Sequence, residues 1–301
     1  MIWLIGNKGM LGTELSVLFD SHSIDYTGTD RETDITDKSA LENFCDGKNI
    51  TLIINCAAYT AVDKAEDDQE ACMRLNASAP AIIGSVAKDL NAQVIHISTD
   101  YVFDGTSPHP YKPDDPASPS GMYGLSKHRG ETALLQVCPE AYVIRTAWLY
   151  GRYGRNFVYT MLKLMKERDS LKVVNDQHGT PTWTYDLSNA ILRIAHLIDA
   201  GKPPAFGVYH YTNKGDTTWY EFARQIYASA SALQIPLRPC LINPCTTSEY
   251  PTKARRPAWS VLDKSKTEQN LGIDIPEWKT SLECFLSSVK ADLTGLLETF
   301  S

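Results

Sequence analysis

Short apolar, β-branched runs alternate with helical patterns along the first half of the chain. This alternation predicts βαβ units and a parallel sheet, and the unbroken apolar character of the runs indicates strands covered by helices on both faces. The predicted strands span 2–5, 25–28, 52–55, 93–98 and 141–145, and the helices between them span 11–19, 39–45, 76–90 and 123–137. An α/β fold is therefore expected.

The second half of the chain has a less regular pattern. Runs at 171–174 and 208–211 predict further strands, which we expect to rejoin the first sheet. Thr218 and Glu221 form a capping-box pattern that predicts the start of a helix, and 278–297 has the period of a terminal amphipathic helix. Prolines predict loops at 107–119, 202–204 and 235–257.

Composition and charge narrow the class of protein. The chain has 301 residues, of which 43% are hydrophobic and 22% charged, so it can bury the core of one large domain or two modest ones. A net charge of -7 disfavours binding to nucleic acid or to an anionic membrane surface. No uncharged apolar run approaches the roughly 20 residues of a membrane span. We expect a soluble protein with neither kind of partner.

The seven cysteines are odd in number, scattered, and free of any C-x-x-C pair. This spacing suggests neither a disulfide framework nor a zinc site. Met1 leads directly into an apolar strand, without the basic segment and cleavage site of a secretory signal. The expected location is the reducing cytoplasm.

A glycine-rich turn follows the first predicted strand and opens into a helix. Its sequence is Gly6-Asn7-Lys8-Gly9-Met10-Leu11-Gly12. Glycine suits a tight turn, close approach of the backbone to a pyrophosphate, and close packing of a helix on a strand. The free N–H groups and positive end of the helix would then bind phosphates. The turn predicts a dinucleotide site.

Residues after the second and third strands bear on which dinucleotide binds. Asp30 lies where an acid can bind the adenosine ribose, whereas Arg31 or Lys8 could pair with a 2′-phosphate. The choice between NADH and NADPH stays open. The small side chains after Asn55 would let a cofactor cross the strand end, although they also suit core packing; the segment is Asn55-Cys56-Ala57-Ala58-Tyr59.

A tyrosine and a lysine form the candidate catalytic pair. Tyr123 and Lys127 stand four residues apart, so a helix places both side chains on one face. A phenol has an ordinary pKa near 10, and a nearby ammonium is expected to lower the pKa of Tyr123. Tyr123 could then act as the general acid of a ketone reduction, with Lys127 also bonding the nicotinamide ribose.

The position of this pair gives it weight. It follows the fourth strand, which ends in Ile97-Ser98-Thr99-Asp100 and so places a hydroxyl at the edge of the sheet where ligands bind in such folds. Thr99 is expected to hydrogen-bond the carbonyl oxygen that is reduced.

These motifs, with others further along, resemble the dTDP-4-dehydrorhamnose reductase family of extended short-chain dehydrogenases. The resemblance covers nearly the whole chain, and the two motifs Asn175–Thr182 and Lys253–Pro257 are more specific than the glycine turn. The matching segments are Gly6–Gly12, Asn55–Glu66, Ser98–Asp104, Tyr123–Lys127, Arg145–Gly151, Asn175–Thr182, Thr217–Tyr220 and Tyr250–Pro257.

The resemblance implies reduction of the C4 keto group of dTDP-4-dehydro-L-rhamnose by NADPH or NADH, the last step of dTDP-L-rhamnose synthesis. It implies that Tyr123 donates the proton, that Lys127 modulates it, and that Thr99 contacts the substrate. Asp100 and Trp148 match positions that contact the sugar nucleotide. Cofactor-contacting positions are matched by Gly9, Met10, Leu11, Asp30, Ala57, Ala58 and Tyr59.

The family fold implies a Rossmann-type, doubly wound nucleotide-binding domain over 1–147 and a smaller substrate-binding domain built mainly from 148–301. Arg255 and Arg256 form a basic pair suited to a diphosphate, and we place one of them near the substrate; surface salt bridges are the alternative. Some members are dimers with Mg²⁺ held by glutamates. Glu14 matches one such position but Tyr185 stands at another, so no metal is expected. The chain is expected to be a monomer or a homodimer.

Four other functions remain to be weighed. A 4,6-dehydratase of the same superfamily carries Thr-Asp-Glu, because elimination of water needs both an acid and a base. Here Tyr101 follows Asp100, so one of the two carboxylates is missing. Another nucleotide-sugar reductase of the superfamily would use the same residues. An epimerase would also use them, but it retains its cofactor, so net consumption of NADPH separates an epimerase from a reductase. A regulatory subunit of the methionine adenosyltransferase type would bind cofactor and partner without turnover. Such a module has no need of Thr99, Tyr123 and Lys127 together.

Overall fold

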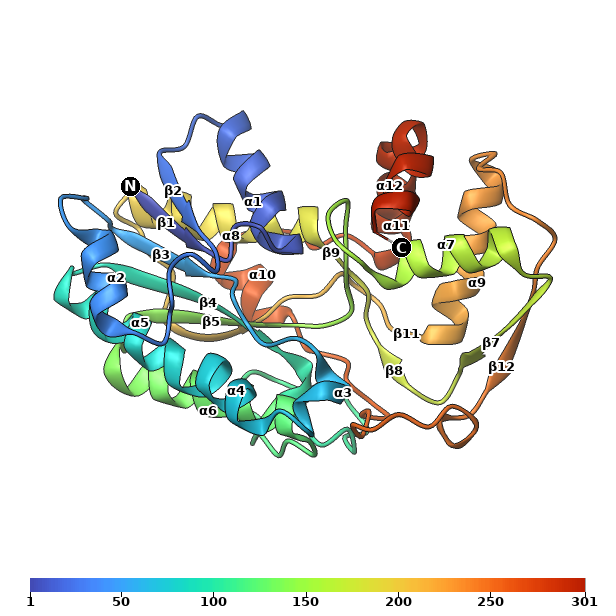
Figure 1. The fold of residues 1–301 in the computed structure, drawn as a ribbon, viewed down its shortest axis with the longest axis horizontal. Helices are drawn as coiled ribbons and strands as arrows, with labels where there is room; N and C mark the ends of the chain where they lie inside the picture. The colour runs from blue at the N-terminus through green and yellow to red at the C-terminus, as the bar shows by residue number, and fades with distance from the viewer. Residues whose placement is uncertain (301) are drawn as a thin grey trace.

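A parallel sheet of six strands forms the centre of the larger of two lobes (Figure 1). The computed structural model describes residues 1–300. The strand order is β10-β5-β4-β3-β1-β2, in which the strands are β1 (Ile2–Ile5), β2 (Tyr26–Thr29), β3 (Leu52–Asn55), β4 (Gln93–Thr99), β5 (Ala141–Thr146) and β10 (Gly207–His210).

The strand order reverses between β1 and β3. From β1 the chain first adds β2 on one side, and then adds β3, β4, β5 and β10 in turn on the other side. Ile5 of β1 pairs with Asn55 of β3, so the two carboxyl ends lie together. A doubly wound sheet opens a crevice at such a reversal, which is where its ligands bind.

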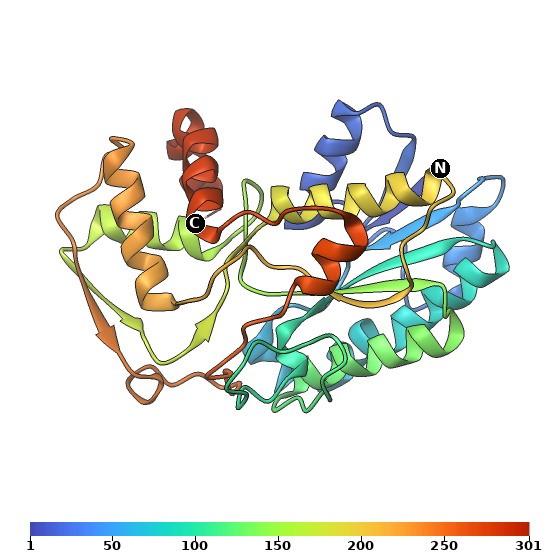
Figure 2. The same cartoon turned by 180° about the vertical axis from the view of Figure 1, so that it is seen from behind.

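Helices cover both faces of the sheet (Figures 1 and 2). Successive side chains of a strand point to opposite faces, so that Leu4 packs in one core and Trp3 in the other. The core that contains Leu4 is covered by α1 (Met10–Ser21), α8 (Thr184–Asp199) and α10 (Ser265–Leu271). The core that contains Trp3 is covered by α2 (Lys38–Cys45), α5 (Ala79–Asp89) and α6 (Met122–Val137).

Several short helical turns connect these elements. The predicted helix over 76–90 begins with a π-helical turn at Arg74–Ser78 before it continues as α5. Such π-helical turns are frequent near functional sites. The other short elements of the larger lobe are α3 (Val62–Ala65), α4 (Gln69–Met73) and a 3₁₀ turn at Asp100–Val102.

The smaller lobe has its own apolar core, with Phe222 and Phe285 fully buried in it. Its helices are α7 (Phe157–Glu167), α9 (Trp219–Ala232), α11 (Trp278–Val289) and α12 (Leu293–Thr299). Its short strand pairs are β6 (Leu149–Tyr150) with β9 (Thr182–Trp183), β7 (Ser170–Val174) with β12 (Leu241–Cys245), and β8 (His178–Gly179) with β11 (Thr217–Thr218). Short 3₁₀ turns occur at Thr247–Glu249 and Lys290–Asp292.

Two predictions for the second half were wrong, and a third was right only in part. The run at 171–174 does not rejoin the main sheet; it lies in β7, which pairs with β12 inside the region 235–257 that the prolines had marked as a loop. The terminal helix over 278–297 is interrupted by a 3₁₀ turn between α11 and α12. A pattern of apolar residues reports that a strand is half-buried, but not which distant partner covers it.

The chain returns to the larger lobe more often than the sequence indicated. Besides β10, the helices α8 and α10 return to the larger lobe and contribute apolar side chains to the core that contains Leu4. Leu187, Ile191 and Ile194 of α8 are buried there at helical spacing. Among residues 1–300, no helix combines the length and apolar character required to cross a membrane.

Gly12 generates a prediction about the turn between β1 and α1. A β-carbon at Gly12 would lie 2.0 Å from the Gly6 carbonyl oxygen and 2.8 Å from Asn7 Cα, and both contacts are with backbone. We expect Gly12→Ala to reduce the free energy of unfolding by about 1–3 kcal/mol, as for other overpacked sites. Denaturant unfolding measures the change.

Gly295→Ala is the matched control, because nothing lies within 4 Å of a β-carbon there and Gly295 is inside α12. That variant should be unchanged or stabilised by about 0.5–1 kcal/mol. Equal stability of Gly12→Ala and the wild type would contradict the packing assigned to Gly12.

Candidate functional site

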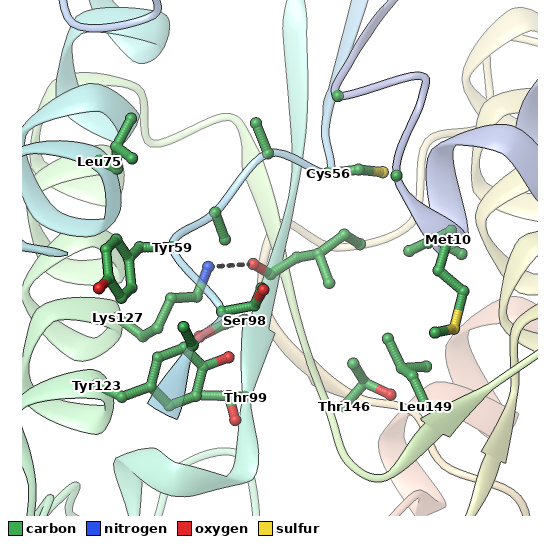
Figure 3. A pocket seen from close by; sticks show the side chains of 18 of the residues that line it. Met10, Cys56, Tyr59, Leu75, Ser98, Thr99, Tyr123, Lys127, Thr146 and Leu149 are labelled. Carbon is green, nitrogen blue, oxygen red and sulfur yellow. Dashed lines mark hydrogen bonds between the residues drawn. The ribbon is translucent and has the colours of Figure 1, made fainter. Parts of the chain in front are cut away.

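A cavity of about 970 Å³ opens at the carboxyl ends of the parallel strands. Figure 3 shows side chains that line it, with Tyr123, Thr99 and Lys127 on one side and Met10, Thr146 and Leu149 on the other. Most residues singled out from the sequence line this cavity: Gly6, Gly9, Met10, Leu11, Asp30, Ala57, Ala58, Tyr59, Thr99, Asp100, Tyr123, Lys127 and Trp148.

The turn between β1 and α1 forms one wall of the cavity. Gly6 has a φ of +78°, in the left-handed region that favours glycine. Gly9 is the N-cap of α1, yet no side chain caps the helix and no acidic residue lies in its first turn. The N–H groups and the positive end of the helix dipole therefore face the cavity, an arrangement that fits the diphosphate of a dinucleotide.

Charged residues after β2 form the next part of the wall. Asp30 and Arg31 both line the cavity, so an acid and a cation are present where the adenosine ribose of a dinucleotide would lie. Lys8 lies outside the lining and pairs with Glu32 at 3.2 Å on the surface. Of the two cations considered for a 2′-phosphate, Arg31 is the one placed at the cavity.

Tyr123 lies in the first turn of α6, and its ring is held by two neighbours. The phenol lies beside the Thr99 hydroxyl (Figure 3), and the ring packs edge-on against Tyr101 at 5.5 Å between centroids. Burial raises the pKa of the Tyr123 phenol above its ordinary value. The expected lowering of this pKa by Lys127 was therefore wrong, and the phenol keeps its proton at neutral pH.

Lys127 follows one turn after Tyr123 and is almost fully buried. Its Nζ donates to the carbonyl oxygen of Ile97 at 2.6 Å, the bond drawn in Figure 3. Burial lowers the pKa of Lys127 to about 8, although Glu131 acts in the opposite direction. The ammonium therefore predominates at neutral pH but can release its proton at low cost.

Asp100 is a buried carboxylate at the end of β4. Its Oδ1 accepts from the Thr99 hydroxyl at 3.0 Å, and Thr99 Oγ1 in turn accepts from the backbone N–H of Tyr101. Burial raises the pKa of Asp100 to about 6, against the effect of the hydroxyls of Ser260 and Thr99. A carboxyl group buried from solvent at the edge of a cavity, with a shifted pKa, is typical of a functional residue.

Trp148 has a strained backbone where it lines the cavity. Its φ of +46° is rare for a bulky residue and costs free energy that the surrounding contacts must offset. The indole of Trp148 stacks on Trp219 of α9, with ring centroids 3.6 Å apart. The backbone carbonyl of Trp148 accepts a hydrogen bond from the N–H of Thr182. The stack fixes an apolar surface from the smaller lobe against the cavity.

Besides Lys8, three other residues singled out as site residues do not line the cavity. Gly12 is packed under the Gly6 carbonyl, so it serves the turn rather than a ligand contact. Arg255 is exposed, and Arg256 donates to Asp63 and to the hydroxyl of Tyr101, both at 2.7 Å. Neither arginine lines the cavity in this structure, and the expected contact of one of them with the substrate stays a prediction.

Other lining residues were missed. Thr146 ends β5 as Thr99 ends β4, and its buried hydroxyl has no hydrogen-bond partner. The rule that identified Thr99 at a strand end would also have identified Thr146. Further lining residues gave no pattern of their own: Thr33, Asp34, Lys64, Leu75 and Arg155.

The family position that suggested a metal has no cluster around it. Glu14 accepts from the Thr184 hydroxyl at 2.9 Å, and Tyr185 is exposed nearby in α8. Within residues 1–300, no group of three or more His, Cys, Asp or Glu side chains is arranged to hold a metal ion.

The doubly wound sheet, the open N-terminus of α1 and the Tyr123–Lys127 pair define a short-chain dehydrogenase/reductase of the extended type. Comparison with known proteins narrows this class. A family model described as the RmlD substrate binding domain matches residues 1–291.

The dTDP-4-dehydrorhamnose reductase of Aggregatibacter actinomycetemcomitans is 39% identical over 282 residues, which cover 93% of this chain and 96% of that protein. A crystal structure of the Clostridium acetobutylicum dTDP-4-dehydrorhamnose reductase has a TM-score of 0.88 at 38% identity and covers 96% of this chain and 99% of that one. The Bacillus anthracis enzyme, solved in complex with NADP, has a TM-score of 0.87 at 33% identity, with 95% and 98% covered. The chain belongs to the dTDP-4-dehydrorhamnose reductase family.

Asp100 generates a prediction about stability and pH. Its folded pKa of about 6 exceeds the ordinary 3.8, so its contribution to stability is present below pH 4 and is lost as the pH rises through 6. Asp100→Asn removes that loss and should raise the free energy of unfolding at pH 7.5 by roughly 2–3 kcal/mol. Denaturant unfolding at several pH values measures the gain.

The same substitution should give no gain at pH 4, which is the internal control. Asp263→Asn is the matched control at a less buried aspartate, which accepts a hydrogen bond from the backbone N–H of Ser265. This variant should show no gain in stability at pH 7.5. A gain independent of pH would show that burial of the Asp100 charge is not its cause.

Proposed function

We propose that this chain reduces the C4 keto group of dTDP-4-dehydro-L-rhamnose to dTDP-L-rhamnose, with NADPH or NADH as the reductant. One observation carries the proposal: the Tyr123 phenol, the Thr99 hydroxyl and Lys127 line the same cavity as the open N-terminus of α1. The names of the family members matched above supply the substrate.

The bound nicotinamide cofactor supplies the hydride that reaches the C4 carbon. The residues of the chain supply the proton and hold the ketone. Tyr123 starts the reaction protonated, because burial raises the pKa of its phenol, so it can donate to the C4 oxygen as negative charge develops there. Thr99 hydrogen-bonds the same oxygen and so restricts the ketone to one orientation.

Lys127 restores the proton that Tyr123 gives up. Its ammonium is buried one helical turn away and has a pKa of about 8. A pKa close to the pH at which the protein works lets the group both release and recover a proton readily. Asp100 and Trp148 lie next to this group in the cavity wall and contact the sugar nucleotide. Gly6, Gly9, Met10 and Leu11 hold the cofactor diphosphate.

The two lobes have separate tasks in this proposal. The sheet-containing lobe, mainly 1–147 with the returning elements, binds the cofactor, and the lobe built from the rest binds the sugar nucleotide. Trp148, at the junction, brings a surface of the second lobe into the cavity. All seven cysteines are free thiols, which supports a reducing, cytoplasmic location.

The assay that tests this function follows the loss of NADPH absorbance on addition of dTDP-4-dehydro-L-rhamnose. Wild-type protein should consume cofactor and keto sugar in equal amounts. An epimerase would convert the sugar without net loss of NADPH, and a regulatory subunit would bind NADPH without turnover. Either result would reject the proposed reaction.

Tyr123→Phe tests the assigned acid. Loss of the phenol hydroxyl should lower kcat by about 10²–10⁴-fold, the range typical of a general acid, while NADPH binding stays close to wild type. Fluorescence titration of NADPH is the control that separates lost chemistry from lost binding. Tyr153→Phe, at a partly exposed tyrosine outside the cavity lining, should retain activity. Full activity of Tyr123→Phe would reject the role of Tyr123.

A further inference from the structure

A histidine that no motif singled out lies directly behind the catalytic lysine. His96 is on β4, fully buried, three residues before Thr99. Its Nε2 lies 3.4 Å from Lys127 Nζ, and its Nδ1 lies 3.0 Å from Asn55 Nδ2. It therefore joins the end of β3 to the lysine through the interior of the protein.

The hydrogen bonds of Asn55 determine which ring nitrogen of His96 carries the proton. The backbone N–H of Ala57 donates to Asn55 Oδ1 at 3.0 Å, which fixes the orientation of the amide. The amide nitrogen of Asn55 must then donate to His96 Nδ1, so Nδ1 is an acceptor. Burial, followed by the Lys127 charge, holds the pKa of His96 well below its ordinary value, so the ring is neutral. Its single proton is on Nε2.

The Nε2–H of His96 therefore points at Lys127 Nζ. An N–H group is attracted to a nitrogen that has a lone pair, which a neutral amine has and an ammonium lacks. Lys127 can satisfy this contact as an amine while one of its own N–H groups donates to the Ile97 carbonyl. In the ammonium form, two donors face each other.

We propose that His96 is a positioning residue that acts through Lys127: held by Asn55 with its proton on Nε2, it favours the neutral amine and so makes the lysine a ready donor of protons to Tyr123. The inference rests on the proposed function for its catalytic meaning. The contacts of His96 with Asn55 and Lys127, on which the inference is based, do not involve cofactor or substrate.

Other groups also face Lys127, and they must be weighed. Glu131, on the next turn of α6, favours the ammonium, as do the thiols of Cys56 and Cys72 when ionised. Glu131 is already paired with Arg145 and the Ser98 hydroxyl, and burial raises the pKa of Cys56 to about 12. Burial also raises the pKa of Cys72 above its ordinary value. None of the three groups is therefore expected to titrate near pH 8, and a change in the protonation of Lys127 there belongs to the lysine and its contact with His96.

The first test needs only the unmodified protein. A ¹⁵N–¹H spectrum of the histidine rings, with the His96 signals assigned from their loss in His96→Gln, should show a neutral ring protonated on Nε2. A ring protonated on Nδ1, or a charged ring, would overturn the proposal. Because no ligand is present, this result does not depend on the proposed reaction.

The second test compares pH profiles of reductive turnover. Loss of the Lys127 proton should produce an alkaline limb near pH 8 in the wild type. In His96→Asn the shorter amide can still bond Asn55 but cannot reach Lys127, so the limb should move up by about one pH unit. His96→Gln can again present an N–H to the lysine and should bring the limb back toward pH 8.

His210→Asn is the matched control. His210 is equally buried on the same sheet, but its Nδ1 lies 3.0 Å from the Tyr111 carbonyl and its Nε2 lies near Arg145, away from Lys127. Its substitution should lower stability without moving the alkaline limb. An unmoved limb in His96→Asn, or an equal movement in His210→Asn, would overturn the proposal.

A third measurement needs neither cofactor nor substrate. A lysine whose folded pKa is about 8 makes the protein more stable as the pH rises from 8 toward 10.5, because the unfolded chain holds more protons in that window. His96→Asn should reduce this rise in Tm, and it should have no effect on the rise in a Lys127→Met background. An equal effect in both backgrounds would show that His96 does not act through the lysine.

Discussion

The position of the catalytic residues depends on a buried ion pair at the back of α6. Glu131 of α6 binds Arg145 of β5, with Nη2 to Oε2 at 2.8 Å, and both side chains are nearly inaccessible to solvent. Burial alone would raise the pKa of Glu131, but His128 and Arg145 outweigh it and hold that pKa at about 2. Separating two such charges would leave each unpaired in a dry interior, at a cost of several kcal/mol. Because Tyr123, Lys127 and Glu131 are spaced four residues apart, the pair that anchors Glu131 also directs the other two side chains toward the cavity.

The same loss of solvent has opposite effects on the titratable groups that line the cavity beside α6. It raises the pKa of the Tyr123 phenol and of the Asp100 carboxyl, because it disfavours their anions. It lowers the pKa of Lys127, because it disfavours the cation. A phenol that holds its proton beside an ammonium that releases its own suits reduction, in which the phenol gives up a proton and must regain it. The chain without ligands therefore already holds Tyr123 and Lys127 in the protonation states from which the reduction starts.

Much of the larger lobe could be predicted from the sequence, because β1, β3 and β5 are short, largely apolar runs and the strands are joined by simple crossovers. β1 and β3 have the predicted bounds, and Thr99 could be recognised as a residue at the edge of the sheet. The smaller lobe could not be predicted, because β7 pairs with β12, a strand far along the chain. The prolines around β12 made that region look like a loop. The sequence also assigned no role to His96 or Ser98. They are polar residues at alternate positions of a buried strand, and their meaning depends on Lys127 and Glu131, which only the folded chain brings to them.

The wall of the cavity beside Tyr123 depends on a residue far along the chain. Arg256 donates to the Tyr101 hydroxyl and to Asp63, and Tyr101 packs edge-on against Tyr123. A second tie, between Lys253 and Asp67, joins the same two segments, but its side chains are 53% and 63% exposed, so solvent screens most of its strength. Arg256 is only 22% exposed and bonds two partners at once, and for that reason it is the tie that holds Tyr101 in place. The geometry of the proton donor is thus determined jointly by its own helix, by the strand behind it and by a loop that follows β12.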